Sequence, residues 1–151
     1  MQLIFRTAVL TDIEYLVSML ADDELGASRE DSSRPLNQNY LNAFGEIDGD
    51  ANNELIVVES NGEVVGMLQL TFIPYLTYVG SWRCLIEGVR IHAKHRGQGL
   101  GAQFFKWAIA RAKARKCKIV QLTSDKGRPA ALRFYESLGF KATHEGFKLK
   151  L

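Results

Sequence analysis

The sequence predicts a single α+β domain over residues 1–151, with a mixed, mostly antiparallel central sheet flanked by helices. An Asn-Gly dipeptide at positions 61–62 joins two apolar runs, which is typical of a β-hairpin. Residues 99–115 carry apolar side chains at helical spacing. No repeat or low-complexity linker divides the chain, and a domain of this length buries roughly 70% of its unfolded surface. We therefore expect one core that needs neither disulfides nor a metal.

The first third of the chain begins with a short strand at residues 4–8 and continues into a helix. Thr11 is the expected N-cap of that helix, and Glu14, three residues later, completes a capping box. Polar and acidic sequence follows over residues 22–53, with one short helical candidate around residues 37–44. We expect a long connection or lid here, and such segments are usually either functional or poorly ordered.

The remaining elements alternate between strands and helices. The hairpin strands cover residues 54–59 and 63–72, and a further strand covers residues 83–91. After them we expect a helix at 99–115, a strand at 118–123, a helix at 129–138 that Gly139 ends, and one or two closing strands at 140–151.

Composition argues against several classes of protein. The two cysteines, Cys84 and Cys117, lie in apolar stretches without metal-ligand or redox spacing, so we expect reduced thiols in a cytoplasmic protein. No apolar run approaches the ~18 residues of a membrane span, and the N-terminus has no signal-peptide pattern. The charges are segregated, since residues 90–118 hold nine Lys or Arg and no acid, whereas residues 22–63 hold 11 of the 17 acids.

The most informative stretch is a glycine-rich turn between a strand and a helix. It consists of Arg96, Gly97, Gln98, Gly99, Leu100 and Gly101. Glycines let the backbone approach a ligand closely, and the free N–H groups at a helix N-terminus suit a phosphate or pyrophosphate. The nearby cations Arg90, Lys94 and Arg96 can add charge-assisted contacts.

A dinucleotide site is the alternative interpretation of this turn. Gly97, Gly99 and Ala102 match G-x-G-x-x-G/A, and Asp125 stands where a ribose-binding acid is expected. However, five residues separate the strand from the first glycine, and only 26 residues follow Asp125. A Walker-type loop is excluded because no Gly-Lys-Ser/Thr follows the turn.

With these features the chain resembles the GNAT superfamily of N-acetyltransferases over essentially its whole length. Arg96, Gly99 and Gly101 meet the pattern Q/R-x-x-G-x-G/A, and a second signature, A-x-x-F-Y-x-x-x-G-F, is met by Ala131, Phe134, Tyr135, Gly139 and Phe140. The resemblance implies acetyl-CoA as acetyl donor, with its pyrophosphate held by residues 96–101 and its pantetheine arm bound by the backbone of Val89, Arg90 and Ile91. Relatives often carry Asn where this chain has Arg128.

Two residues are candidates for the chemistry of acetyl transfer. Glu87 is the candidate general base, because it is the only acid between Glu63 and Asp125 and an apolar strand can raise the pKa of a carboxyl. Its alternative is a surface residue paired with Arg83 or Arg90. The resemblance places Tyr135 beside the cofactor sulfur, where its phenol can protonate the departing thiolate; the alternative is a packed tyrosine.

The expected reaction is direct attack by a primary amine, on a small molecule or a protein, in a ternary complex. The acids of residues 22–50 would attract a cationic amine, and Tyr75, Tyr78 and Trp82 would provide cation–π walls. A non-catalytic acyl-CoA-binding regulatory module is the alternative function. We expect no metal site, no nucleic-acid partner and no membrane association; the hairpin and the late strands offer edges for a homodimer, which is common among relatives.

Overall fold

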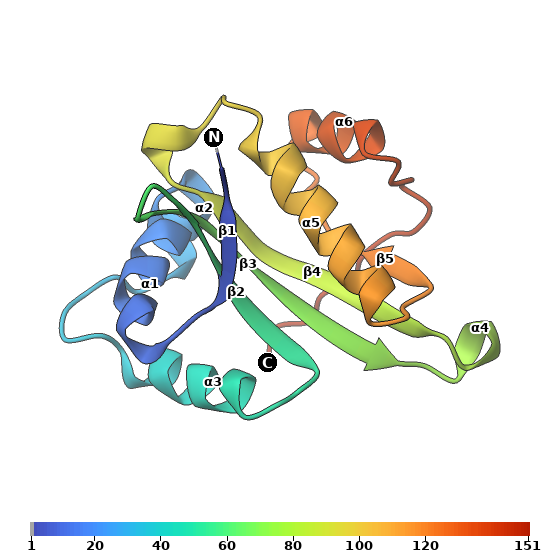
Figure 1. Cartoon of the computed structure of the whole chain (residues 1–151), viewed down its shortest axis with the longest axis horizontal. Helices are drawn as coiled ribbons and strands as arrows, with labels where there is room; N and C mark the ends of the chain where they lie inside the picture. Colours follow the sequence, from blue (N-terminus) through green and yellow to red (C-terminus); the bar gives the residue numbers. More distant parts are fainter. Residues whose placement is uncertain (1) are drawn as a thin grey trace.

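The computed structural model describes residues 2–151, and its five strands form one sheet in the order β1-β2-β3-β4-β5 (Figure 1). The strands are β1 (Ile4–Thr7), β2 (Asn53–Ser60), β3 (Glu63–Pro74), β4 (Trp82–Ile91) and β5 (Ile119–Gln121). Neighbouring strands are antiparallel except for the parallel pair β4 and β5. The predicted mixed, mostly antiparallel sheet is thus confirmed, and its single parallel pair does not match the repeated parallel units of a dinucleotide-binding sheet.

Helices cover both faces of the sheet. They are α1 (Ile13–Ala21), α2 (Glu24–Arg29), α3 (Gln38–Asp48), α4 (Thr77–Gly80), α5 (Leu100–Ala114) and α6 (Pro129–Ser137). The larger core lies under α5, where Phe104 and Phe105 pack on Leu70, Phe72 and Ile86. A second core joins α1 and α3 to Leu55, Val57 and Met67 on the opposite face. No helix within residues 2–151 is long and apolar enough to cross a membrane.

The hairpin of β2 and β3 forms as the sequence predicts. Ser60 and Glu63 are register partners, and the two residues between them have positive φ angles of 51° at Asn61 and 78° at Gly62. These angles match a type I′ turn, whose twist fits that of the flanking strands.

The start of α1 differs from the prediction. Residues Leu10–Asp12 form a 3-10 turn, and α1 begins at Ile13 without a side-chain cap, so the expected capping box of Thr11 and Glu14 is wrong. Asp12 provides the polar contacts instead, because its carboxylate accepts a 2.8 Å hydrogen bond from the Val9 N–H and pairs with Arg6 at 2.8 Å.

The acidic connection is more ordered than the sequence predicts. It contains α2 as well as α3, and α3 continues to Asp48 rather than ending near Phe44. The Asn37 side chain caps α3 by accepting a 2.9 Å hydrogen bond from the Asn39 N–H. Tyr40, Leu41, Phe44 and Ile47 pack on the second core, which stabilises a helix whose other positions are mostly polar.

Strand β4 separates from β5 after a short shared stretch. The two pair only from Arg83 with Ile119 to Leu85 with Gln121, so β5 is shorter than the predicted 118–123, while β4 continues to Ile91 beside β3. A bulge interrupts the pairing of β4 with β3, because Gly88 and Val89 of β4 oppose Leu68 of β3 alone. Gly88 has a φ of 62°, a left-handed angle that glycine accepts without steric cost.

The predicted closing strands at 140–151 are wrong for this chain. After α6 the described chain contains no further strand, and Phe147, Leu149 and Leu151 are 93%, 87% and 116% exposed. The apolar alternation that favours a strand is present, but only Phe140 packs on the core of the chain, and the residues after it pair with no strand in the described chain.

Gly66 on β3 provides a test of the main core. A Cβ at this position would lie 2.4 Å from the Phe104 ring and 2.5 Å from the Arg90 carbonyl oxygen. We expect Gly66→Ala to lower the free energy of unfolding by about 1–3 kcal/mol through overpacking, measured by urea denaturation. The control is Gly45→Ala at an exposed position of α3. No atom lies within 4 Å of a Cβ added there, and the higher helix propensity of alanine should raise the free energy of unfolding by up to about 1 kcal/mol. Equal effects of the two substitutions would contradict this account.

Candidate functional site

The separation of β4 from β5 leaves one backbone edge of β4 free. From Glu87 to Ile91 the strand pairs with β3 but not with β5, so the N–H and C=O groups on that side are available to a ligand. Val89 and Ile91 pack toward the core under α5, whereas the Arg90 side chain reaches Asp23 beside α2. This part of β4 therefore lies between the two faces of the sheet.

The glycine-rich turn lies directly after this free edge. Gly97 and Gly99 both have φ angles of 75°, and no atom lies within 4 Å of an added Cβ at either position. Gly99 is the N-cap of α5 and has no side chain with which to cap it, so the first N–H groups of α5 are open to a ligand. A Cβ at Gly101 would meet Phe134 of α6 at 3.3 Å, which keeps the start of α5 close to α6.

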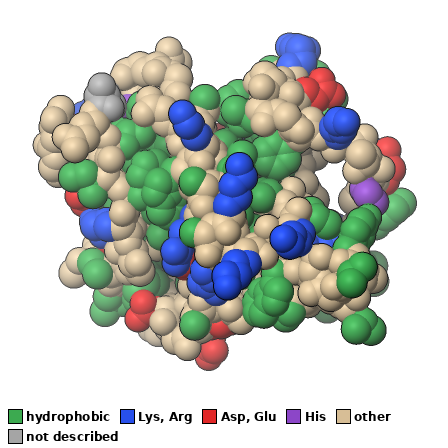
Figure 2. All heavy atoms as spheres, turned by 45° about the vertical axis from the view of Figure 1, so that its right-hand side comes forward, with side chains coloured by type: hydrophobic (Ala, Val, Ile, Leu, Met, Phe, Trp, Pro, Cys, Tyr) green, Lys and Arg blue, Asp and Glu red, His purple; other side chains and the backbone are tan. Residues whose placement is uncertain are grey.

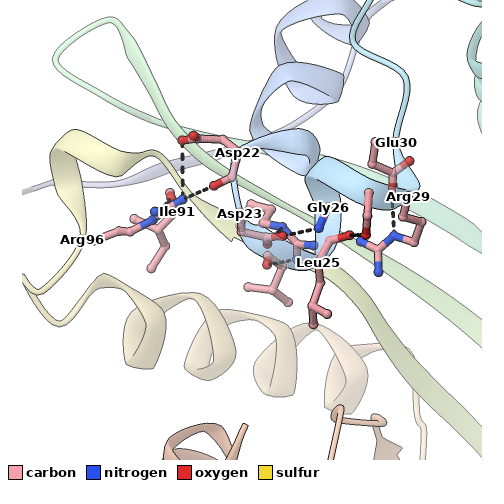
Figure 3. A network of polar contacts seen from close by, with 11 residues as sticks. Asp22, Asp23, Leu25, Gly26, Arg29, Glu30, Ile91 and Arg96 are labelled. Atoms are coloured by element: carbon pink, nitrogen blue, oxygen red, sulfur yellow. Dashed lines mark hydrogen bonds and ion pairs between the residues drawn. The ribbon is translucent and has the colours of Figure 1, made fainter. Parts of the chain in front are cut away.

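Arg96 turns back from the glycine-rich turn toward the junction between α1 and α2 (Figure 3). Its Nε donates to the Ile91 carbonyl at 3.1 Å, and its Nη2 donates to the Asp22 carbonyl at 3.1 Å. The Asp22 carboxylate lies 3.6 Å from the same Nη2. The motif arginine is therefore already held by an internal anion.

Arg90 of β4 makes a similar contact with Asp23, the residue after Asp22. Its Nε lies 3.3 Å from the Asp23 carboxylate, which also accepts a hydrogen bond from the Gly26 N–H and so caps α2 (Figure 3). Burial lowers the pKa of the Arg90 guanidinium, and the Asp23 charge opposes that shift. The sequence suggested that the Arg90 side chain assists the phosphate turn, but it holds α2 against β4 instead.

Glu87 is exposed, so the expectation of a carboxylate desolvated by an apolar strand is wrong for the free protein. The alternative of a paired surface residue does not fit either. Within residues 2–151 Glu87 makes no ion pair, because Arg83 donates to Gln121 at 3.0 Å and Arg90 contacts Asp23. Glu87 is thus an unpaired carboxylate at the end of the β4–β5 ladder.

Tyr135 lies on α6 on the opposite side of the sheet, under α5. Its half-buried ring is edge-on to Phe105 at 5.5 Å, so part of the packing interpretation is correct. Its hydroxyl has no hydrogen-bond partner in the described chain, which leaves the group free to contact a ligand.

The predicted aromatic walls have another role in the free protein. Arg83 lies over the rings of Tyr75 and Tyr78, at 4.4 and 5.1 Å from their centres. These faces are therefore occupied by an internal cation, and they are not open walls for a cationic amine.

Neither thiol is positioned as a nucleophile. Cys84 is fully buried, and burial raises its pKa to about 12; burial also raises the pKa of Cys117. A useful thiolate fraction near neutral pH is therefore absent. No group of three potential metal ligands occurs among residues 2–151, and the His92 ring stacks on Tyr15 at 5.9 Å.

Several Lys and Arg side chains gather in the middle of one face, as Figure 2 shows. At the end of α5, Arg111 and the C-cap residue Arg115 share one anionic partner, because both pair with Glu54 of β2. A cavity of about 370 Å³ lies between β1, β2 and α5, and one of about 210 Å³ lies between β1 and α3; neither includes a predicted cofactor residue.

Sequence reasoning missed three features of this site. The bulge at Gly88 had a signal, because an isolated glycine inside a strand pattern indicates a bulge. The contacts of Asp22 with Arg96 and of Asp23 with Arg90 had none, since they join residues that are 74 and 67 positions apart.

Comparisons with known proteins agree with this arrangement. The model of the Acetyltransferase (GNAT) family matches residues 15–140. The chain is 33% identical over 87 residues to an aminoalkylphosphonate N-acetyltransferase from Salmonella typhimurium, a match that covers 58% of this chain and 56% of that protein. The chain therefore aligns with about half the length of that curated relative.

Solved structures extend the similarity to the whole chain. The chain is 58% identical in sequence to a protein from Bacillus halodurans whose crystal structure is described as that of a transcriptional regulator. The two structures superpose with a TM-score of 0.95, and the match covers 99% of this chain and 100% of that one. An acetyltransferase from Trypanosoma brucei is 26% identical with a TM-score of 0.77, covering 99% and 100% of the two chains.

The dual contact of Asp23 predicts a graded loss of stability. Asp23→Asn retains a good helix cap but leaves half-buried Arg90 without its anion, so we expect a loss of about 1–3 kcal/mol in the free energy of unfolding. Asp23→Ala also removes the cap and should cost about 1 kcal/mol more. Urea denaturation measures both effects, and Glu24→Gln, which breaks no ion pair in the described chain, is the control. Asp23→Asn matching the control would rule out the Arg90 contact as a stabilising one.

Proposed function

Because the chain belongs to the GNAT acetyltransferase family, we propose that it is an N-acetyltransferase that moves the acetyl group of acetyl-CoA to a primary amine by direct attack in a ternary complex. The observation that carries this proposal is the free edge of β4 next to the uncapped N-terminus of α5. An extended arm that ends in a pyrophosphate needs a strand edge and an anion site in that order.

The residues around this edge fit acetyl-CoA. The open backbone of Gly97 and Gly99 and the N–H groups of Leu100 and Gly101 suit the pyrophosphate, with Arg96 and Gln98 alongside. The backbone of Val89, Arg90 and Ile91, along the edge that β5 leaves unpaired, suits the amides of the pantetheine arm. On this edge the Val89 and Ile91 carbonyls already accept hydrogen bonds from the Arg90 and Arg96 side chains. Acetyl-CoA supplies the thioester whose carbonyl carbon the amine attacks.

Glu87 is the proposed general base. A lysine-like amine has a reference pKa of ~10.4 and is almost wholly protonated near neutral pH, so a group must accept its proton before attack. Glu87 has no competing ion pair among residues 2–151 and lies on the face shared with α2. An acceptor amine that binds there places its proton within reach of the carboxylate, directly or through one water.

Tyr135 is the proposed general acid. When the new C–N bond forms, the C–S bond breaks and the sulfur leaves as a thiolate, which the phenol of Tyr135 can protonate. Its free hydroxyl on α6 supports this role, as does its packing on Phe105 of α5, which fixes the ring. A backbone N–H of β4 can stabilise the charge that develops on the acetyl oxygen.

The acceptor is a small amine or an exposed protein amine in this proposal. Two features direct the choice of probes. Asp31, which follows α2 and makes no ion pair within residues 2–151, favours cationic amines, whereas Glu30 beside it already pairs with Arg29 at 2.8 Å. The name of the Salmonella relative suggests aminoalkylphosphonates as further probes, and these carry an anionic group as well as the amine.

A second candidate function is a regulatory module that binds acyl-CoA without turnover. The specific observation in its favour is the 58% identity to a protein described as a transcriptional regulator. Both functions predict that acetyl-CoA and CoA raise the unfolding temperature, but only the first predicts turnover.

We expect the purified chain to release free CoA thiol when acetyl-CoA is mixed with an accepted primary amine. Glu87→Gln and Tyr135→Phe should each lower kcat by about 100-fold or more, because each removes a proton-transfer group. Neither should change the dissociation constant of CoA, measured by calorimetry, because neither contacts the pyrophosphate turn.

Glu136→Gln, on exposed α6 beside Tyr135, is the control and should keep wild-type rates. Stabilisation by CoA with no thiol release from diamines, peptide amines or aminoalkylphosphonates would favour the regulatory module. Full activity of Glu87→Gln would remove Glu87 from the mechanism.

Asp22 should compete with the cofactor for Arg96. In the free protein its exposed carboxylate lies 3.6 Å from the guanidinium that the pyrophosphate would contact. We therefore expect Asp22→Asn to tighten CoA binding by about two- to five-fold, the size of a surface ion pair. Calorimetry at low and high salt measures this effect, which should shrink as salt screens the pair. Glu24→Gln removes the same charge nearby without a contact to Arg96, and an equal gain in that variant would refute direct competition.

A further inference from the structure

The cavity of about 370 Å³ between β1, β2 and α5 has no part in the proposed reaction. Its volume is within the range of small-molecule sites in proteins. Two strands, β2 and β3, lie between β1 and β4 in the sheet, so β1 is remote from the free edge of β4 (Figure 1). The cavity is therefore a candidate site for a second ligand.

Apolar side chains from three elements line much of this cavity. The Phe5 ring of β1 lies parallel to the Trp107 ring of α5, with the ring centres 4.6 Å apart. Phe104 packs edge-on against Phe5 at 5.8 Å and so fixes this pair from the side of the core. Ile56 of β2, which is 4% exposed, and Ala110 of α5 complete the apolar lining. An aromatic ring bound here would be removed from water by these groups.

The polar end of the cavity carries an excess of positive charge. Arg111, which lines the cavity, and Arg115 share the single carboxylate of Glu54. The Nε of Arg111 donates to the two carboxylate oxygens at 3.1 and 3.0 Å, and its Nη2 donates to the same group. Within residues 2–151 the Nη1 of Arg111 makes no hydrogen bond. This cluster can therefore attract one further negative charge and offer it a guanidinium N–H.

Arg6, the other cation that lines the cavity, is already saturated with acids. It pairs with Asp12 at 2.8 Å and with Glu59 at 2.7 Å, so two carboxylates surround one guanidinium. Neither of these acids lines the cavity. The anionic group of a ligand is therefore favoured beside Arg111 rather than beside Arg6.

Thr7 provides a second donor on the β1 wall of the cavity. The Ala8 N–H donates to the Leu55 carbonyl at 2.8 Å, and successive residues of an antiparallel strand turn their backbone groups to opposite sides. The Thr7 N–H is therefore turned away from β2. Because β1 is the edge strand of the sheet, no other strand of the described chain pairs with that N–H.

We propose that this cavity binds a small organic monocarboxylate with an aromatic body. The carboxylate accepts hydrogen bonds from Arg111 Nη1 and the Thr7 N–H, and the ring packs on Trp107. A monoanion matches the single positive charge left where two arginines share one carboxylate, whereas a phosphate dianion would exceed it. This site does not depend on acetyl transfer, because no residue proposed for that reaction lines the cavity.

The probe is hydrocinnamate, which joins a phenyl ring to one carboxylate, and its binding to the full chain is measured by calorimetry. Hydrocinnamyl alcohol, the neutral molecule of nearly the same shape, should bind at least about ten-fold more weakly, because it lacks the charge that Arg111 meets. The chain has two tryptophans, so Trp82→Phe leaves Trp107 as the only one, and its fluorescence should change on binding. Saturating CoA should leave the affinity for hydrocinnamate unchanged.

Two pairs of variants locate the site. Ala110→Phe fills the cavity and should abolish binding, whereas Ala114→Phe, an equal change at an exposed position of α5 outside the cavity, should bind as the wild type does. Arg111→Met should weaken binding by about ten-fold or more, whereas Lys113→Met, which removes a cation from the same helix outside the cavity, should not.

Thermal unfolding without ligand shows that each variant is folded, and the exposed Ala110 position keeps the test valid even where Arg111→Met destabilises the chain. A wild-type chain that does not bind hydrocinnamate, equal binding of the alcohol, displacement of the probe by CoA, or wild-type binding by Ala110→Phe would each overturn the proposal.

Discussion

The constraint on which the rest of the structure depends is the early end of the pairing between β4 and β5. Three residue pairs hold the two strands together, and the bulge at Gly88 then changes how β4 lies against β3. As a result, a buried strand presents a free backbone edge inside the fold, where solvent-exposed edges are normally avoided. The glycine-rich turn, the start of α5 and Tyr135 on α6 lie on one side of this opening, and Glu87, Arg90 and α2 lie on the other.

The local parts of the fold could be predicted because their signals lie within a few residues. Asn61 and Gly62 define their own turn, and the apolar face of α5 repeats at helical spacing. The start of α1 could not be predicted in the same way, because Asp12 rather than Thr11 accepts from a backbone N–H there, and Arg6 of β1 pairs with the same carboxylate. The closing strands failed for a different reason, since alternation predicts a strand but does not provide an edge with which it can pair.

In the candidate site, too, the features set by local sequence could be predicted and those set by distant contacts could not. The glycine-rich turn follows from a short motif and lies directly after the free edge of β4, and Tyr135, from a second motif, packs on Phe105 of α5. The contacts of the charged side chains could not be predicted from motifs, because each contact is with a residue that is far away in sequence. Arg83, Arg90 and Arg96 are all held by partners that no local pattern indicates, namely Gln121, Asp23 and Asp22.

The alternation of side chains along β4 has a practical consequence for how the protein can be used. Val89 and Ile91 face the helix α5 side, whereas Glu87 is exposed and Arg90 reaches toward α2. A donor that lies along α5 and an acceptor that arrives past α2 would use separate entrances to one opening. Chemists could then enlarge or recharge the acceptor entrance by replacing residues of α2 without touching the donor entrance.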